Sequence, residues 1–142
     1  MQIGLIGLGK MGMNMAQRLV RGGHNVVGTA RSSASVQEAE RFGVTGAHSV
    51  EELVVKLSSP RAVWVMVPAG QATEDVITSL IPLLQAGDIV IDGGNSNYKD
   101  SVRHAETLKE HGLGFLDCGT SGGVWGLTEG YSLMIGGEPE TA

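Results

Sequence analysis

Short apolar runs alternate along the chain with longer stretches whose apolar residues recur at spacings of three and four. Six of these runs predict β-strands, because they are rich in apolar and β-branched residues. They are Gln2–Ile6, Asn25–Thr29, Ala62–Val67, Ile89–Asp92, Gly114–Cys118 and Tyr131–Ile135. The runs are continuously apolar rather than alternating in polarity, which is typical of strands buried on both faces of a sheet.

Helices are predicted in the stretches between these runs. The first has apolar residues at helical spacing over Met11–Val20 and is expected to end at Gly22–Gly23. A second begins near Ser49, where the Ser49 hydroxyl and Glu52, three residues later, have the spacing of a capping box. The spacing also predicts helices over Ala72–Leu84 and Tyr98–His111.

Two residues set the expected ends of the later helices. Pro82 lacks a backbone N–H and should end or kink its helix, and Gly112 suits the position after a helix terminus. With strand and helix alternating throughout, the chain predicts an α/β fold: a Rossmann-like, doubly wound, mostly parallel sheet with helices on both faces.

Composition agrees with one packed domain over residues 1–142. Of the 142 residues, 42% are hydrophobic and 18% are charged, which excludes a mainly disordered chain. Glycine is in excess, with 22 residues, about twice its usual share of roughly 7%. Many glycines must therefore serve loops or close approaches of the backbone.

Charge and cysteine content exclude several kinds of partner. The net charge is −5 and Lys and Arg are not clustered, so neither nucleic acid nor a membrane surface is expected as a partner. The single cysteine, Cys118, cannot form an internal disulfide, which fits a cytoplasmic protein. Metal-ligand spacing is lacking among the four histidines, which are His24, His48, His104 and His111. We therefore expect no metal.

The first loop contains the strongest motif in the chain. It has the form G-x-G-x-x-G, directly after a predicted strand and at the start of a predicted helix, and it reads Gly7-Leu8-Gly9-Lys10-Met11-Gly12. In such a motif the first glycine allows a tight turn, the second lets a pyrophosphate approach the backbone, and the third lets helix and strand pack closely. We expect these six residues to bind a dinucleotide, with the Lys10 side chain facing solvent.

The end of the second strand indicates which dinucleotide binds. An NAD site is expected to have Asp or Glu here for the ribose 2′-hydroxyl, but this chain reads Ala30-Arg31-Ser32-Ser33. Arg31 can pair with a 2′-phosphate, and Ser32 can donate a hydrogen bond to it. NADP is therefore favoured, with NAD possible. In the alternative interpretation, Arg31 is an ordinary surface residue and Ser32 or Ser33 caps the next helix.

Three further loops are expected at the same edge of the sheet, because the carboxyl ends of parallel strands meet there. They are Val67-Pro68-Ala69-Gly70, Asp92-Gly93-Gly94-Asn95-Ser96 and Asp117-Cys118-Gly119-Thr120-Ser121-Gly122-Gly123. The Asn95 side chain and the backbone around Ser121, Gly122 and Gly123 would suit hydroxyl and anionic groups of a small substrate. Otherwise Asn95 and Ser96 form a turn and a helix cap, and the glycines a flexible loop.

These loops together resemble the cofactor-binding domain of the decarboxylating 6-phosphogluconate dehydrogenases, a branch of the β-hydroxyacid dehydrogenase superfamily. The resemblance spans Met1 to about Gly137 and rests on the motifs Gly7–Gly12, Asp92–Ser96 and Gly119–Gly126. It implies oxidation of 6-phospho-D-gluconate by NADP or NAD, followed by loss of CO₂ to give ribulose 5-phosphate in the pentose phosphate pathway. A different β-hydroxyacid dehydrogenase, such as one acting on 3-hydroxyisobutyrate, and a non-catalytic nucleotide-binding module are the alternatives.

The resemblance also implies roles for individual residues. Val67, Pro68 and Ala69 would border the nicotinamide. Asn95 would contact both cofactor and substrate, and Ser121, Gly122 and Gly123 would bind the substrate. Arg31 would match the arginine that binds the 2′-phosphate in NADP-dependent members. Those members often have Asn before this arginine and Thr after it, whereas this chain has Ala30 and Ser32.

The catalytic residues are expected outside these 142 residues. The resemblance implies a general-base lysine and a general-acid glutamate in a C-terminal helical substrate domain that would follow Ala142. We therefore assign no catalytic residue within residues 1–142, and we expect the isolated chain to be inactive. The resemblance further implies a homo-oligomer in the complete enzyme, assembled through that helical domain.

Overall fold

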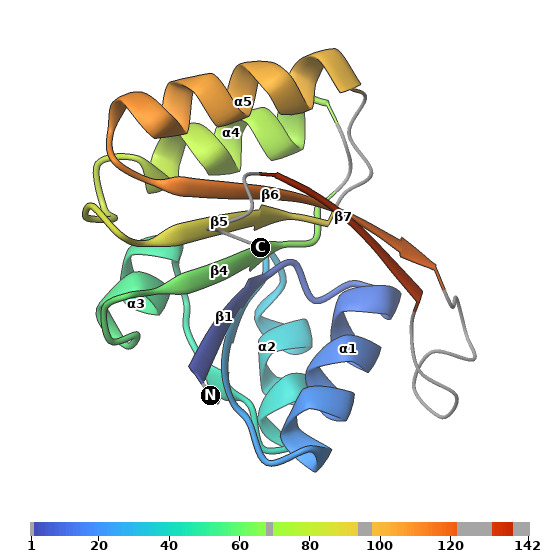
Figure 1. The fold of residues 1–142 in the computed structure, drawn as a ribbon. Helices are drawn as coiled ribbons and strands as arrows, with labels where there is room; N and C mark the ends of the chain where they lie inside the picture. Colours follow the sequence, from blue (N-terminus) through green and yellow to red (C-terminus); the bar gives the residue numbers. More distant parts are fainter. Residues whose placement is uncertain (1, 68–69, 94–97, 122–131, 138–142) are drawn as a thin grey trace.

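The computed structural model describes residues 2–67, 70–93, 98–121 and 132–137 (Figure 1). Within these residues the chain forms a sheet of seven strands with five helices. The strands are β1 (Gln2–Ile6), β2 (Asn25–Thr29), β3 (Thr45–Gly46), β4 (Ala62–Val65), β5 (Ile89–Asp92), β6 (Gly114–Ser121) and β7 (Ser132–Gly137). The helices are α1 (Lys10–Arg21), α2 (Ser33–Glu40), α3 (Val50–Val55), α4 (Gln71–Leu80) and α5 (Tyr98–Glu110).

The strand order is β3-β2-β1-β4-β5-β6-β7, and the neighbours from β3 to β6 all run parallel. Strand β7 pairs with β6 in the antiparallel direction, from Ser121 opposite Ser132 to Leu116 opposite Gly137. The chain winds outward in opposite directions from β1, so a crevice for a ligand is expected where the carboxyl ends of β1 and β4 meet. The predicted doubly wound, mostly parallel sheet is confirmed.

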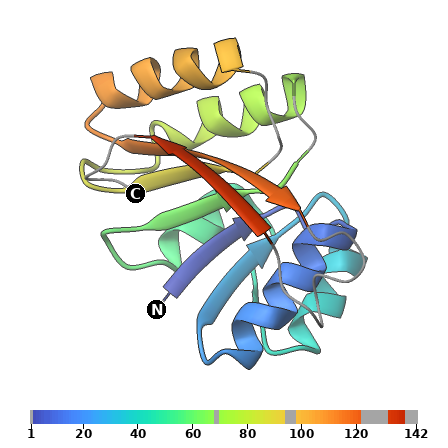
Figure 2. The same ribbon diagram turned by 45° about the vertical axis from the view of Figure 1, so that its right-hand side comes forward.

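Helices cover both faces of the sheet, and an apolar core lies between the sheet and the helices on each face (Figures 1 and 2). On one face, α1 and α2 contribute Met13, Ala16 and Val36 to a core that includes Leu5 of β1. On the other face, α3, α4 and α5 contribute residues such as Leu53, Ile77, Leu80 and Leu108. Because both faces are covered, the strands read as continuous apolar runs.

Capping and proline chemistry determine where α3 and α4 begin and end. Ser49 is the N-cap of α3, since its Oγ accepts a hydrogen bond from the Glu52 backbone N–H at 3.0 Å. The Glu52 carboxylate accepts from the backbone N–H of His48, at 2.8 Å, rather than from that of the cap residue. Helix α4 ends at Leu80, two residues before Pro82, as expected for a residue that lacks the helical N–H.

A buried carboxylate joins the loops at the amino ends of β4 and β5. Asp88, whose side chain is fully buried, accepts hydrogen bonds from the backbone N–H of Arg61 at 2.7 Å and of Gln85 at 2.9 Å. It also accepts from Ser59 Oγ at 2.9 Å and pairs with the Arg61 guanidinium at 3.2 Å. Burial alone would raise the pKa of Asp88, but these hydrogen bonds outweigh it and lower the pKa below its ordinary value.

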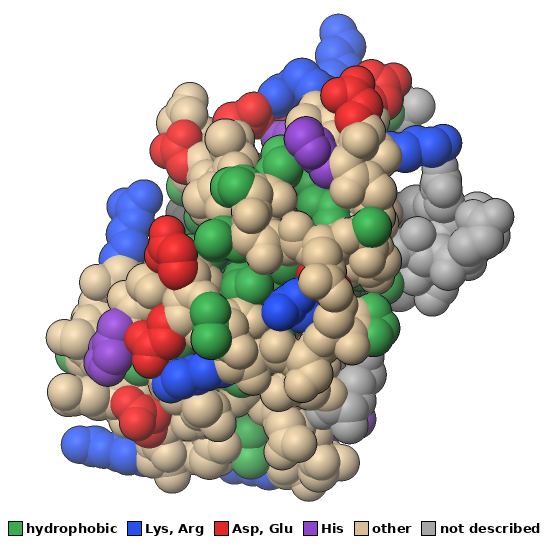
Figure 3. Space-filling model, turned by 90° about the vertical axis from the view of Figure 1, so that its left-hand side faces the viewer, with side chains coloured by type: hydrophobic (Ala, Val, Ile, Leu, Met, Phe, Trp, Pro, Cys, Tyr) green, Lys and Arg blue, Asp and Glu red, His purple; other side chains and the backbone are tan. Residues whose placement is uncertain are grey.

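Figure 3 shows the side of the molecule on which strands β4 to β6 begin. Lys and Arg side chains on this face are interspersed with Asp and Glu, and apolar side chains lie between them. Among the helices of the described residues, none has both the length and the apolar character needed to cross a membrane.

Candidate functional site

A cleft of about 490 Å³ opens at the carboxyl edge of the sheet, at the point where the strand order reverses. Segments that follow four neighbouring strands line it. At and after the ends of β1 and β2 these are Ile6, Gly7, Leu8, Gly9, Thr29, Ala30, Arg31, Ser32 and Ser35; after β3 and β4 they are His48, Ser49, Val50, Met66, Val67, Ala72 and Val76. Ligands of open α/β sheets bind in this position.

The three glycines of the first loop differ in what a side chain at each position would contact. Gly7 has a φ of +102°, and a Cβ there would lie 2.5 Å from the Met66 carbonyl oxygen. A Cβ on Gly12 would collide with the Gly7 carbonyl oxygen, so that close contact of helix and loop requires glycine. A Cβ on Gly9 would have no atom within 4 Å. Gly9 therefore satisfies no packing requirement of the described residues, and its exposed backbone lines the cleft.

Helix α1 begins at this loop and brings a partial positive charge to the cleft. Its N-cap is Gly9, whose carbonyl accepts from the Met13 N–H at 2.7 Å, and its first turn contains no acidic residue. Arg18 and Arg21 lie in its last turn, where cations complement the opposite end of the dipole. The free N–H groups of a helix start, next to an open glycine, suit a phosphate.

The segment after β2 contributes a cation to the cleft. The Arg31 side chain is exposed and forms no ion pair with any residue in the described ranges. Ser32 is the N-cap of α2, and its Oγ accepts from the Ser35 N–H at 3.4 Å. The alternative interpretation of Ser32 as a helix cap is thus correct, although Ser32 also lines the cleft. Arg and Ser with no carboxylate among the lining residues favour an anionic ligand group.

Several predicted cofactor residues come together at the cleft, and others lie elsewhere. Those lining it are Gly7, Leu8, Gly9, Ala30, Arg31, Ser32 and Val67. Lys10, Met11 and Gly12 form the first turn of α1 and are not among the lining residues. Pro68, Ala69, Asn95, Gly122 and Gly123 lie outside the described residues, and Ser121 is the last residue of β6. The binding roles of all these residues remain predictions.

Sequence reasoning missed the lining residues contributed by β3 and α4. Strand β3 has only two residues, Thr45–Gly46, which is too short to give an apolar run, so the segment that follows it was not recognised as a strand end. That segment brings His48, Ser49 and Val50 into the cleft. On the α4 side, the available signal was the i, i+4 pair of apolar residues Ala72 and Val76 in the helix predicted over Ala72–Leu84.

Two carboxylates lie side by side farther along the same edge. Asp92 of β5 and Asp117 of β6 are register partners on parallel strands, and Asp92 is fully buried. Burial raises the pKa of Asp117, and the neighbouring Asp92 charge adds to this, while the Ser101 hydroxyl opposes it. No group of three or more His, Cys, Asp or Glu among the described residues could hold a metal ion.

Comparison with known proteins identifies the family to which the chain belongs. Residues 2–142 match the family model described as the NAD binding domain of 6-phosphogluconate dehydrogenase. The chain is 44% identical over 137 residues to the NAD⁺-dependent decarboxylating 6-phosphogluconate dehydrogenase of Haloferax volcanii, covering 96% of this chain and 45% of the relative. It is 45% identical over 143 residues to the NADP⁺-dependent decarboxylating enzyme of Bacillus subtilis, covering 98% of this chain and 30% of the relative.

The fold of the chain is also similar to that of a solved 6-phosphogluconate dehydrogenase. The 6-phosphogluconate dehydrogenase of Plasmodium falciparum, studied with NADP⁺ and with 6-phosphogluconate, superimposes with a TM-score of 0.92 at 35% identity. The match covers 99% of this chain and 32% of that one. The chain spans less than half the length of these proteins. It belongs to the family of the NAD-binding domain of 6-phosphogluconate dehydrogenase.

Proposed function

We propose that this chain is the cofactor-binding part of a decarboxylating 6-phosphogluconate dehydrogenase. In that reaction the C3 hydroxyl of 6-phosphogluconate is oxidised, with its hydride passing to NADP⁺ or NAD⁺, and the resulting β-keto acid loses CO₂ to give ribulose 5-phosphate. The observation that carries the proposal is the Gly9 backbone, open to a cleft at the switch point of the sheet, in a chain about 44% identical to such enzymes.

Each part of the dinucleotide has a proposed group of residues to bind it. The start of α1 and Gly9 would bind the pyrophosphate, and Arg31 would face the ribose of the adenosine. Val67, after β4, would border the nicotinamide, which supplies the hydride acceptor when it is bound. Asn95, Ser121, Gly122 and Gly123 would bind the substrate.

General acid and base are proposed to come from a part of the enzyme that follows residue 142. Each such step typically supplies about 10²–10⁴-fold in rate. The 142-residue chain should therefore bind NADP⁺ and NADPH but show little or no reduction of NADP⁺ with 6-phosphogluconate. A protein extended by a helical substrate domain should be active with 6-phosphogluconate. Activity with 3-hydroxyisobutyrate instead would move the assignment to another branch of the superfamily.

Within this proposal, NADP is the favoured cofactor. Relatives include both NAD⁺-dependent and NADP⁺-dependent enzymes, so family membership alone does not decide between the two. Arg31 on the cleft, together with the lack of any carboxylate among the lining residues, supports NADP.

Replacing Arg31 with alanine should weaken NADPH binding far more than NADH binding. A hydrogen bond to a charged group contributes about 1.5–3 kcal/mol, which corresponds to roughly 10- to 100-fold in the Kd for NADPH. We expect the Kd for NADH to rise less than about twofold, because NADH has a neutral 2′-hydroxyl in place of the 2′-phosphate. Titration of the chain with each nucleotide, followed by nicotinamide fluorescence, measures both constants.

Arg41→Ala is the matched control for this change. Arg41 is an exposed arginine at the carboxyl end of α2 and does not line the cleft. Its replacement should leave both affinities unchanged. Equal losses of NADPH and NADH affinity in Arg31→Ala would contradict the 2′-phosphate role.

A further inference from the structure

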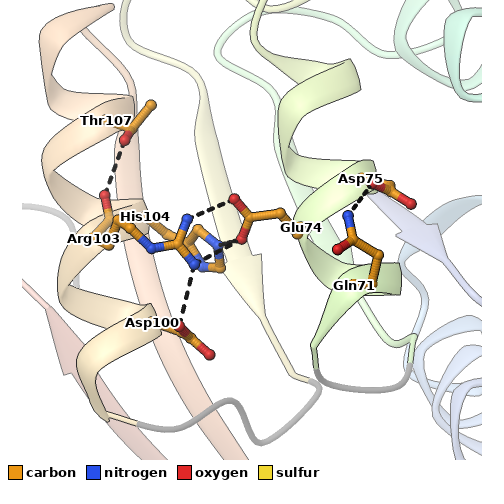
Figure 4. A network of polar contacts seen from close by, with 7 residues as sticks. All are labelled: Gln71, Glu74, Asp75, Asp100, Arg103, His104 and Thr107. Carbon is orange, nitrogen blue, oxygen red and sulfur yellow. Dashed lines mark hydrogen bonds and ion pairs between the residues drawn. The ribbon is translucent and has the colours of Figure 1, made fainter.

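Helices α4 and α5 are joined by a network of charged side chains on the face of α4 that points to α5 (Figure 4). The Glu74 carboxylate of α4 accepts two parallel hydrogen bonds from the Arg103 guanidinium, at 2.6 and 2.9 Å. Its Oε2 also lies 2.7 Å from Nε2 of His104, which must donate because an ionised carboxylate can only accept. We call Glu74, Arg103 and His104 the clamp.

The Glu74 carboxylate of the clamp is ionised well below neutral pH. The Arg103 hydrogen bonds, followed by that of His104, lower the pKa of Glu74 to about 2. Arg103 is in turn oriented by Asp100, whose Oδ1 accepts from it at 3.1 Å. A bidentate pair of this kind fixes the relative position of two side chains better than a single contact does.

On the α5 side, the clamp is anchored to the sheet. The His104 side chain is buried and lies edge-on against the Phe115 ring of β6, with the ring centroids 6.2 Å apart. Leu108, one turn further along α5, is completely buried in the core of the same face. Glu74 therefore bonds to a helix whose position is set by β6.

On its other side, α4 forms part of the cleft wall. Ala72 and Val76 both line the cleft, and Glu74 lies two residues from each of them. Successive residues of an α-helix are rotated by about 100°, so a residue two positions away lies about 200° around the helix, on the opposite side. Helix α4 thus lies between the clamp and the cleft, and the clamp acts on its outer side.

Apolar side chains from α4 and α3 line one part of the cleft. Ala72 and Val76 share the cleft with Val50 at the start of α3 and with Arg31, which is proposed to face the adenosine ribose. The adenine ring extends from that ribose, and side chains of this kind would contact its faces. A small displacement of α4 would change the space available to the ring.

We propose that Glu74, held by Arg103 and His104, is a positioning residue that sets the width of the cleft beside the adenine of the bound cofactor. The inference rests on the proposed dinucleotide binding and goes beyond it, because none of the three clamp residues lines the cleft. The expected consequence is that the cleft selects for the size of the base, through residues on the side of α4 opposite the cleft.

The test compares NADP⁺ with 1,N⁶-etheno-NADP⁺, whose base carries one additional fused ring. The wild-type 142-residue chain should bind the etheno analogue more weakly than NADP⁺. In Glu74→Ala, NADP⁺ should bind about 3- to 10-fold more weakly, the size of effect expected for a residue that acts on a ligand through another element. The etheno analogue should lose almost no affinity, because the wider cleft accommodates its additional ring. The Kd of the etheno analogue divided by the Kd of NADP⁺ should therefore fall about 3- to 10-fold.

Asp75→Ala is the matched control on the same helix. Asp75 points away from α5, and its only contact in Figure 4 is a 2.7 Å hydrogen bond from Gln71. Its loss should leave the ratio of Kd values unchanged. Circular dichroism establishes that each variant is folded at the assay temperature. If Glu74→Ala is unfolded there, Arg103→Lys, which retains the charge but loses the parallel bonds, replaces it with the same expected fall in the ratio.

Three results would count against the proposals, and they are distinguishable. If the folded wild-type chain binds neither nucleotide, the proposed function fails. If it binds both nucleotides equally well, α4 does not limit the width of the cleft, and the role of the clamp is overturned. If a folded clamp variant loses affinity for both nucleotides by the same factor, the clamp has a general structural role only, and the positioning inference is overturned.

Discussion

Replacing Gly9 with alanine should prevent tight binding of NADP while leaving the chain folded. Gly9 has φ −71° and ψ −172°, which alanine adopts without strain, and its Cβ would meet no atom within 4 Å. The methyl group would instead occupy the space through which a pyrophosphate approaches the backbone. Losing two hydrogen bonds to a charged group, at about 1.5–3 kcal/mol each, corresponds to at least about 100-fold in Kd.

Gly12→Ala is the informative comparison, because the same methyl group there acts on the fold. Its Cβ would collide with the Gly7 carbonyl oxygen and lie 3.2 Å from the Gly7 carbonyl carbon. Relief requires the loop and α1 to separate, and overpacking of this kind typically costs about 1–3 kcal/mol. Gly12→Ala should therefore lower both the free energy of unfolding and the affinity for NADP.

Urea denaturation and NADPH titration of the two variants measure these effects separately. For Gly9→Ala we expect a free energy of unfolding within about 1 kcal/mol of wild type, since alanine is a somewhat poorer N-cap than glycine. Wild-type affinity for NADPH in Gly9→Ala would mean that the pyrophosphate does not bind at this loop, and the dinucleotide site would have to be sought elsewhere.

The fold class could be predicted from the sequence because its signals are local and agree with one another. Continuously apolar strands, helical spacing and the caps at Ser49 and Gly112 each correspond to an observed element boundary or covered face. Errors occur where pairing partners determine the boundary. Strand β6 extends to Ser121, beyond the predicted Cys118, because β7 returns antiparallel beside it. Pairing of this kind leaves little trace in the β6 sequence itself.

The candidate site was predicted mainly where glycines or charges mark it. The Gly7–Gly12 loop and Arg31 are recognisable because few other residues can meet their conformational or electrostatic requirements. His48 and Val50 reach the cleft because two-residue β3 pairs with β2, a tertiary contact with no periodic signal. The clamp at Glu74 was also missed, since its partners lie about 30 residues further along the chain.

Replacing Asp88 with alanine should be among the most destabilising single changes in this chain. The variant would leave the Arg61 guanidinium, which is 19% exposed, without its carboxylate, and two backbone N–H groups without their acceptor. Removing one partner of a buried ion pair typically costs about 3–5 kcal/mol. Urea denaturation at pH 7 should show a loss of this size. Cofactor affinity measured where the variant is folded should be unchanged, because Asp88 lies at the opposite edge of the sheet from the cleft.

The pH dependence of the free energy of unfolding separates the contribution of the Asp88 charge from that of the packing of its side chain. Its pKa is lowered in the folded state, so its ionised form contributes stability above the ordinary carboxyl pKa, and this contribution disappears as the pH falls through the folded pKa. Asp88→Asn should therefore be less stable than wild type at pH 7, and the difference should shrink in acid. Asp75→Asn, at an exposed carboxylate, should change the free energy of unfolding by no more than about 0.5 kcal/mol. A difference between wild type and Asp88→Asn that is the same at pH 7 and in acid would show that the buried charge contributes nothing and that only the packing of the side chain matters.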